Sequence, residues 1–197
     1  MAERLTVLQI AQRAMHSIGM AAPTTLFSSS DDNASQLLQC LNETADDMIR
    51  RYDWQVLKTE GEITTTAEED QGDIYDLFTD FRRYINDTGW NVSTQTKLVG
   101  PASSQLWRQA KASSALGVVG GLFRFVNDHL YIYGQSTASQ TIEIEYISSR
   151  WLKNGLDRKD SITVNSDICL LHAQTMIFGV QARWLSRNGQ DSSAANA

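Results

Sequence analysis

The most constraining stretch of this 197-residue chain runs from Phe123 to Trp151, where apolar and polar residues alternate over three successive runs. Successive side chains of a β-strand point to opposite faces, so this alternation is typical of strands with one buried and one solvated face. The first run stops at Asn127-Asp128, a pair that tolerates the left-handed backbone of a tight turn. We therefore expect a hairpin at this pair and one half-buried antiparallel sheet built from all three runs.

Two helices are expected near the N-terminus. Thr6 and Gln9 have the spacing of a capping box, and Gly19 can end the helix that follows. Asp31, Asp32 and Asn33 offer both a cap and negative charge for the start of the second helix. The apolar stripe of this second helix recurs at helical spacing: Leu37, Leu41, Ala45, Met48 and Tyr52.

A third helix is expected after the sheet, capped by Asn165 or Ser166 and carrying Asp167 in its first turn. It has two apolar stripes. They are Leu170, Ala173, Ile177, Val180 and Trp184, and beside them Leu171, Phe178, Ala182 and Leu185. So wide an apolar surface requires burial on more than one side.

The segment from Asn86 to Ser114 is poor in apolar residues apart from a few positions such as Trp90 and Trp107. A structureless loop of this length is unusual inside a compact domain. Either it is an insertion that packs against another copy or another protein, or the two tryptophans fold back and plug the end of the sheet.

These patterns predict an α+β fold. Residues 1–53 and 165–188 would form a helical bundle of two N-terminal helices and a long C-terminal helix. Residues 54–164 would form a β-rich insertion, an antiparallel sheet or small barrel with a long loop, and residues 189–197 an extended tail.

Composition narrows the functional classes. The formal net charge of −6 argues against a protein that grips nucleic acid through its phosphates. No apolar run is long enough to cross a bilayer and the N-terminus lacks a secretory signal pattern, so we expect a cytoplasm-like compartment. Cys40 and Cys169, each placed in a predicted helix, are expected to be buried thiols rather than a disulfide.

No cofactor or metal site is predicted. Glu43, Asp46 and Asp47 form an acidic cluster on the second helix, which we interpret as a solvated helix face. The three histidines lie far apart without the spacing of metal ligands: His16, His129 and His172.

An enzyme remains an alternative interpretation. A hydrolase acting on nucleic acid or peptidoglycan could use Glu143 and Glu145, which share the solvated face of a predicted strand, or the group Asp73, Asp76 and Asp80. A small monomeric binding module is a further alternative.

Seven landmarks occur in order along nearly the whole chain. They are TVLQIAQRAMHSIGM, LLQCLNETADDMIRRYDW, YDLFTDFRR, Gly100-Pro101 followed by Trp107, FRFVNDHLYIY, IEIEYISSRW and ARWLSRNG. In this order they resemble the head-to-tail adaptor proteins, also called connector or tail tubular A proteins, of tailed and in particular short-tailed bacteriophages.

The resemblance implies a structural virion protein rather than an enzyme. Such a protein would form a homo-oligomeric ring of about twelve subunits between the portal protein and the tail nozzle. The ring would continue the channel for DNA ejection, and double-stranded DNA would pass without sequence-specific binding. The expected location is the neck or tail of the virion, and the host cytoplasm during assembly, with no membrane contact.

The resemblance also implies where partners would bind. In similar adaptors the C-terminal segment reaches the portal, which makes these residues candidates for portal contact: Arg183, Arg187, Gln190, Asp191, Ser192, Ser193, Ala194, Ala195, Asn196 and Ala197. Trp90 and Trp107 are candidates for contact with another subunit or the nozzle.

Overall fold

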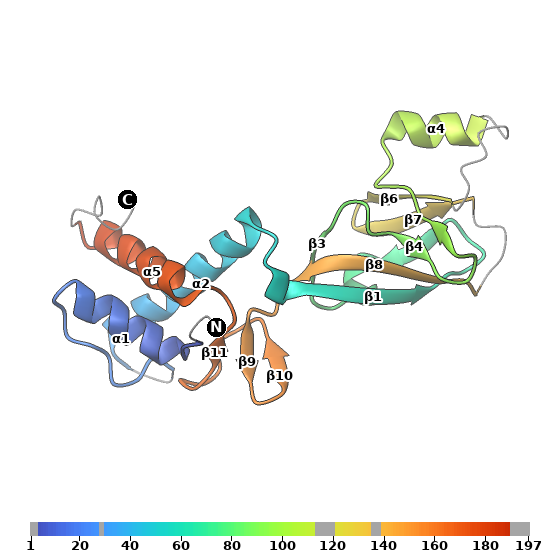
Figure 1. Cartoon of the computed structure of the whole chain (residues 1–197). Coiled ribbons are helices and arrows are strands. Elements are labelled where there is room, and N and C mark those ends of the chain that lie inside the picture. The colour runs from blue at the N-terminus through green and yellow to red at the C-terminus, as the bar shows by residue number, and fades with distance from the viewer. Residues whose placement is uncertain (1–3, 28–29, 113–120, 135–138, 190–197) are drawn as a thin grey trace. The chain divides into compact units, whose positions relative to one another are not determined.

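The protein is described here by a computed structural model of residues 4–27, 30–112, 121–134 and 139–189 (Figure 1). It is a mixed α+β protein, with five α-helices and several antiparallel sheets among those residues. The chain divides into two compact units. The helical unit comprises Met1–Leu57 and Ser149–Ala197, and the β unit comprises Lys58–Ser148.

Three helices build the helical unit: α1 (Val7–Ser17), α2 (Asp32–Arg51) and α5 (Ala173–Arg187). The capping box of α1 is confirmed, because the Gln9 amide donates to the Thr6 hydroxyl while the Thr6 amide donates to the Gln9 side chain. The cap of α2 is confirmed as well, since the Asp31 carboxylate accepts from the Asn33 amide. Local capping therefore defines where both helices begin.

The core of this unit lies where α5 meets both N-terminal helices. Gln181 of α5 donates to the Ala14 carbonyl and the Ser17 hydroxyl of α1. Burying a large apolar side chain contributes roughly 1.5–3 kcal/mol. The side chains buried here are Ile10, Met15, Leu37, Leu41, Met48, Ile177, Val180 and Trp184.

The predicted start of the third helix is wrong. Helix α5 begins at Ala173 and is capped by His172, whose ring accepts from the Thr175 amide. Asn165 does not cap a helix, because its side-chain oxygen accepts from the backbone amides of Leu26 and Phe27.

Asp167 is likewise used in a turn and not in a first helical turn. Its carboxylate is buried and accepts from the backbone amides of Thr163 and Val164. It also accepts from Lys159 at 2.6 Å and from the Asn154 amide group. Asp167, a residue type that often caps helices, thus stabilises a turn that precedes α5.

A three-stranded sheet in the helical unit follows the order β10-β9-β11. Its strands are β9 (Leu152–Asn154), β10 (Asp157–Lys159) and β11 (Ile168–Cys169), and the short 3₁₀ helix η1 (Gln55–Leu57) belongs to the same unit. Cys169 therefore lies in a strand, whereas the sequence pattern predicts a helix there. Backbone bonds from Val7 to Asp167 and from Cys169 to Leu5 tie this region to the start of α1. Strands β9 and β10, which lie within the segment expected as the insertion, thus cluster with the helical unit.

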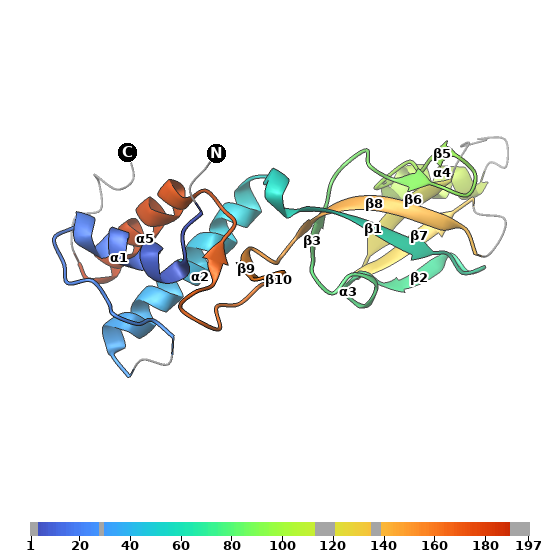
Figure 2. The same ribbon diagram turned by 60° about the horizontal axis from the view of Figure 1, so that its bottom comes forward.

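The β unit contains two antiparallel sheets, which Figure 2 shows from a second side. The larger sheet has the order β1-β8-β4-β5, and β3 also pairs with β8. Its strands are β1 (Lys58–Thr64), β3 (Phe81–Tyr84), β4 (Trp90–Asn91), β5 (Thr96–Lys97) and β8 (Thr141–Ser148). The smaller sheet, β2-β7-β6, consists of β2 (Asp70–Asp73), β7 (His129–Tyr133) and β6 (Leu122–Val126).

The hairpin at Asn127-Asp128 is confirmed. Both residues have positive φ, 51° and 64°, and they join β6 to β7. The prediction that the third run continues the same sheet is wrong, because β8 pairs with β1 instead. Alternation predicts which face of a strand is buried, but not which strand lies beside it.

The two sheets share one hydrophobic core. Phe123, Leu130 and Ile132 come from the smaller sheet, and Ile142 and Ile144 from the larger one. The helix α3 (Ile74–Leu77) adds Ile74 to this core. The alternation expected from the sequence is present in β7 and in the first part of β8, and its buried residues line a core between the two sheets. In β6 it is absent, because the neighbouring residues Leu122 and Phe123 are both buried.

The segment from Asn86 to Ser114 is not structureless. It contains β4, β5 and the helix α4 (Ser104–Ala112). The two strands have two residues each and are too short to show any period. In α4 only Trp107 and Ala110 are buried, so its apolar stripe is too narrow to recognise.

Candidate interaction surfaces

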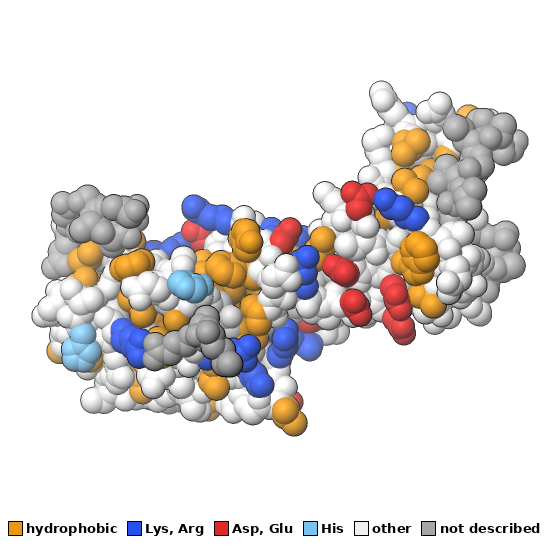
Figure 3. All heavy atoms as spheres, viewed as in Figure 1, with side chains coloured by type: hydrophobic (Ala, Val, Ile, Leu, Met, Phe, Trp, Pro, Cys, Tyr) orange, Lys and Arg blue, Asp and Glu red, His pale blue; other side chains and the backbone are white. Residues whose placement is uncertain are grey.

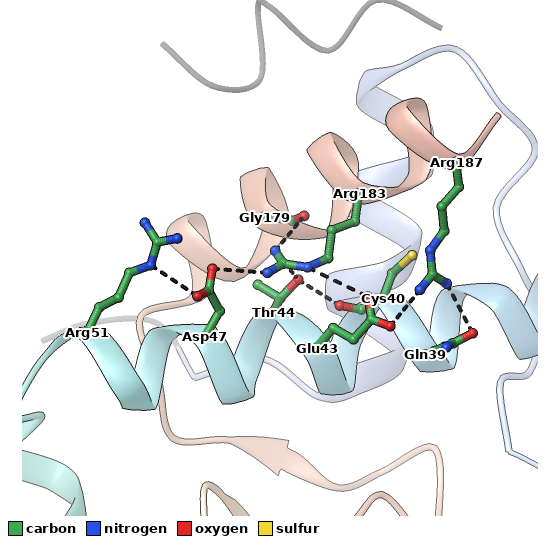
Figure 4. A network of polar contacts seen from close by, with 9 residues as sticks. All are labelled: Gln39, Cys40, Glu43, Thr44, Asp47, Arg51, Gly179, Arg183 and Arg187. Carbon is green, nitrogen blue, oxygen red and sulfur yellow. Dashed lines mark hydrogen bonds and ion pairs between the residues drawn. The ribbon is translucent and has the colours of Figure 1, made fainter. Parts of the chain in front are cut away.

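Arg183 and Arg187, two of the predicted portal-binding residues, donate to α2 (Figure 4). Arg183 lies 3.0 Å from the Asp47 carboxylate and 3.2 Å from the Thr44 hydroxyl. Arg187 lies 2.6 Å from the Glu43 carboxylate and also contacts Gln39. Both guanidinium groups are therefore engaged within the helical unit.

The acidic cluster on α2 is partly exposed and ion-paired. The side chains of Glu43 and Asp47 are 41% and 36% exposed. Burial alone would raise the pKa of Asp47, but the hydrogen bonds from Arg183 and Arg51 outweigh it and the pKa lies below its usual value. Asp46 pairs with Arg50 one turn further along. The acidic face of α2 therefore binds Arg183 and Arg187 of α5 and is also partly exposed to solvent.

Both cysteines are free thiols, as expected. Burial raises the pKa of Cys40, and it raises the pKa of Cys169 to about 12. Both thiols are therefore uncharged at neutral pH, and neither has the lowered pKa of a reactive cysteine.

The outer face of α5 is apolar and carries no charge. Phe178 is 47% exposed, and Ala182 and Leu185 lie one and two turns further along the same side. The flanking positions of this face are Gln174, Thr175 and Ser186, which are also uncharged. Of the second stripe expected from the sequence, the described residues of the protein leave Phe178 exposed and Ala182 and Leu185 half-buried, whereas Leu171 is buried.

Four glutamates form an acidic face on the larger sheet of the β unit. In the register of β1 and β8, Glu60 lies opposite Glu145 and Glu62 opposite Glu143. Acidic side chains gather over these strands in Figure 3. Burial and the neighbouring Glu62 raise the pKa of Glu143 above its usual value. Like charges directly opposite each other destabilise a strand pair, so this arrangement is costly for folding.

The β unit is also acidic as a whole. Residues 58–148 contain seven Lys and Arg and twelve Asp and Glu, which gives a net charge of −5 of the −6 of the whole protein. The negative charge is therefore concentrated in the β unit.

Asp73 and Asp80, two acids of the alternative catalytic group, make structural hydrogen bonds in the β unit. Asp73 caps α3 by accepting from the Tyr75 amide, and Asp76 lies within α3. Asp80 accepts from the hydroxyls of Tyr146 and Ser148, at 2.8 Å and 2.6 Å. Asp73 thus caps a helix, and Asp80 binds two side chains of β8.

The two tryptophans singled out from the sequence have different environments. Trp90 is 40% exposed on β4, beside Glu143. Trp107 is 2% exposed and packs with Ala110 and Leu122. For Trp107 this favours the alternative in which a tryptophan folds back onto the sheet.

Trp107 belongs to a cluster of rings and cations between α4 and the smaller sheet. The guanidinium carbon of Arg124 lies 4.4 Å from the Trp107 ring centre and 5.6 Å from that of Tyr131. Lys111 lies 6.0 Å from the Trp107 ring and pairs with Glu69 at 2.6 Å. Two donors in this cluster, the Trp107 Nε1 and the Arg124 Nε, are buried and have no acceptor among the described residues.

An open pocket of about 800 Å³ lies beside this cluster. Its lining residues are Glu68, Glu69, Asp70, Gln71, Gly72, Lys111 and Tyr131. Nearby, His129 lies 3.0 Å from Asp70. The hydrogen bond with Asp70 raises the pKa of His129 and stabilises the imidazolium form.

Among the described ranges, no group of three or more His, Cys, Asp or Glu residues has the arrangement of a metal site. His16 lies on α1, His172 caps α5 and His129 pairs with Asp70. No helix in the described part of the protein is both long and apolar enough to span a membrane. The predicted portal-binding residues from Gln190 to Ala197 lie outside the described residues.

Sequence reasoning missed the pairing of Trp107 with Arg124. Arg124 lies on the side of its run that the sequence pattern predicts to be solvated, opposite Tyr131 in the neighbouring strand. A lone Arg between Phe123 and Phe125 indicates only a polar face. The helix that covers it could not be inferred from that run.

Comparison with protein-family models finds no family that matches this sequence. Comparison with curated protein sequences finds no significant match either.

Proposed function

We propose that this protein is a structural head-to-tail adaptor of a tailed bacteriophage. It forms a ring between the portal protein and the tail nozzle and continues the channel through which DNA leaves the capsid. The order of sequence landmarks along the protein supports this proposal, and so does the uncharged, partly exposed apolar face of α5.

The α5 face is the observation that carries the proposal. A solvated helix normally places charged residues on its outer side. Here the outer side presents Phe178, Ala182 and Leu185 without a single charge. An uncharged apolar strip with an exposed Phe178 and the half-buried Ala182 and Leu185 favours contact with another protein surface, and in a ring every subunit offers that surface to its neighbour.

In this proposal α1, α2 and α5 form the helical bundle from which the ring is built. The ion pairs of Arg183 and Arg187 with α2 hold α5 in place, so that its apolar face is preformed. The two arginines then support the C-terminal segment that follows α5, and residues Gln190 to Ala197 supply the portal contact. Trp90, exposed on the β unit, is the candidate for contact with the nozzle or a subunit.

Native mass spectrometry with the portal protein of the same phage tests this role. The full-length protein and a variant truncated after Asn188 are each mixed with assembled portal. We expect rings on the portal with the full-length protein and none with the truncated variant, because the tail is the proposed anchor.

Failure of the full-length protein to bind portal at any ratio would overturn the adaptor role. If the truncated variant binds as well as the full-length protein, the tail is not the portal contact. That result would not contradict the formation of a ring. Circular dichroism of both proteins shows whether truncation has altered the fold.

A further inference from the structure

Two buried donors have no assigned acceptor. They are the Nε1 of Trp107, a residue only 2% exposed, and the Nε of the partly buried Arg124, neither of which has an acceptor among the described residues. Leaving a buried donor unsatisfied costs about 1–3 kcal/mol, and more when the group is charged. Native proteins rarely tolerate such donors, so an acceptor from outside the described part of the protein is expected.

The two donors belong to one cluster. The guanidinium of Arg124 contacts the rings of Trp107 and Tyr131, at 4.4 Å and 5.6 Å from carbon to ring centre. It makes no ion pair with a described residue, whereas its neighbour Lys111 is neutralised by Glu69. Ring contacts leave the in-plane N–H groups of a guanidinium available, and these are the donors that bind flat anions in pairs.

The negative charge around the cluster favours an anion of low charge over one of high charge. Glu68, Glu69 and Asp70 line the adjacent pocket, and the β unit has a net charge of −5. A phosphate group carries a charge of about −1.5 to −2 and would be repelled more strongly than a carboxylate with its single charge. Nucleic acid is disfavoured for the same reason.

We propose that Trp107 and Arg124 form a binding site for a single carboxylate of a partner polypeptide, either an acidic side chain or the C-terminal carboxylate. The carboxylate accepts from the indole N–H and from the guanidinium together. This site goes beyond the adaptor role and does not depend on it.

Helix α4 covers the site. Trp107 and Ala110 are its buried residues, and the Trp107–Arg124 contact and the Lys111–Glu69 ion pair join it to the rest of the β unit. The open pocket brings a ligand to Lys111 and Tyr131, which both contact the cluster. Binding at the two donors therefore requires α4 to move outward.

The test is a titration of the full-length protein followed by NMR of the tryptophan and arginine side-chain N–H groups. The probes are the α-amide of N-acetyl-aspartate, whose only carboxylate is that of the aspartate side chain, and N-acetyl-alanine, whose only carboxylate is terminal. We expect saturable shifts of the Trp107 and Arg124 signals with one shared midpoint. The probe that binds more tightly shows which source the site prefers.

Variants separate this site from general effects. Arg124→Gln should raise the midpoint by roughly tenfold or more, because a charge-assisted pair is lost. Trp107→Phe keeps the ring and removes the N–H, so it should weaken binding less and retain the Arg124 shift. Arg108→Gln on the exposed side of α4 is the matched control and should leave the midpoint unchanged.

The proposal is overturned if neither probe gives a saturable shift, which would mean that water satisfies the donors. It is also overturned if Arg124→Gln binds as tightly as the unmodified protein, or if inorganic phosphate binds more tightly than both probes. Should Arg124→Gln fail to fold, an unchanged midpoint in Trp107→Phe together with an unshifted Arg124 signal would equally overturn it.

Discussion

Gly179 of α5 lies against Thr44 of α2. A Cβ at this position would overlap the Cγ2 of Thr44, whose hydroxyl donates to the Cys40 carbonyl and accepts from Arg183. The residue is therefore small because the helices approach closely there, and not because the helix needs flexibility.

Gly179→Ala should destabilise the protein by roughly 1–2 kcal/mol, because the overlap outweighs the better helix propensity of Ala. Adding Thr44→Ser removes the overlapping methyl group and keeps the hydroxyl. The double variant should therefore recover most of the loss. Urea unfolding of both single variants and the double variant measures this, and a Gly179→Ala protein as stable as the unmodified one would contradict the close approach.

Glu143 faces Glu62 across the β1–β8 pair. Its raised pKa means that the folded state binds a proton more tightly than the unfolded state. The destabilising contribution of Glu143 should therefore decrease as the pH falls through its folded-state pKa, and it should be absent below the ordinary value of 4.5.

Glu143→Gln should raise the thermal midpoint of the protein at neutral pH, where the repulsion acts, and have little effect in acid, where Glu143 is protonated. Glu68→Gln removes a charge from a loop of the same unit and serves as the control. Equal midpoints for the two variants at neutral pH would argue against cross-strand repulsion.

At the scale of the elements, Asp167 joins the small sheet to the start of α1. Its buried carboxylate holds Lys159 and two backbone amides, and its carbonyl accepts from the Val7 amide. Burial alone would raise its pKa, but these hydrogen bonds outweigh it and the pKa is lowered.

Asp167→Asn should cost about 2–4 kcal/mol, slightly less than a fully buried pair because Lys159 is 22% exposed. Asp157→Asn, on the exposed side of β10, should cost little. Because the folded-state pKa of Asp167 is lowered, its contribution is present above 3.8 and is lost as the pH falls through that lowered pKa. Urea midpoints at neutral and acid pH should converge for Asp167→Asn and the unmodified protein, and a constant gap would contradict this account.

The elements that could be predicted are those encoded by neighbouring residues. Helices α1 and α2 begin at caps that bond to residues two or three positions away, and the β6–β7 turn depends on one residue pair. The start of α5 was missed because Asn165 and Asp167 could cap a helix or close a turn, and contacts with Leu26 and Lys159 decide between them.

Distant pairings escaped prediction for a related reason. Strand β8 pairs with β1, which is distant in the sequence. The sequence pattern of β8 indicates only that one of its faces is buried. At the candidate surfaces, the apolar face of α5 could be predicted from its stripe. The acids of α2 that bind Arg183 and Arg187 could not, because nothing in the α2 pattern indicates which helix it faces.

At the scale of the whole molecule, the two units divide the surface properties of the protein. The β unit carries nearly all of the net charge, with the four opposed glutamates on its larger sheet. The helical unit carries the uncharged outer face of α5. An adaptor ring would use the second property to associate and the first to avoid holding DNA in its channel.

The apolar face of α5 as a subunit interface is the central claim, and native mass spectrometry of charge-adding variants tests it most directly. Ala182→Glu places a charge in the middle of the face, and Gln36→Glu places the same charge on an exposed position of α2. Both are measured alone and on assembled portal. We predict complete rings for the unmodified protein and for Gln36→Glu. For Ala182→Glu we predict isolated subunits or incomplete rings. Complete rings with Ala182→Glu, or a monomeric unmodified protein under every condition, would contradict the account.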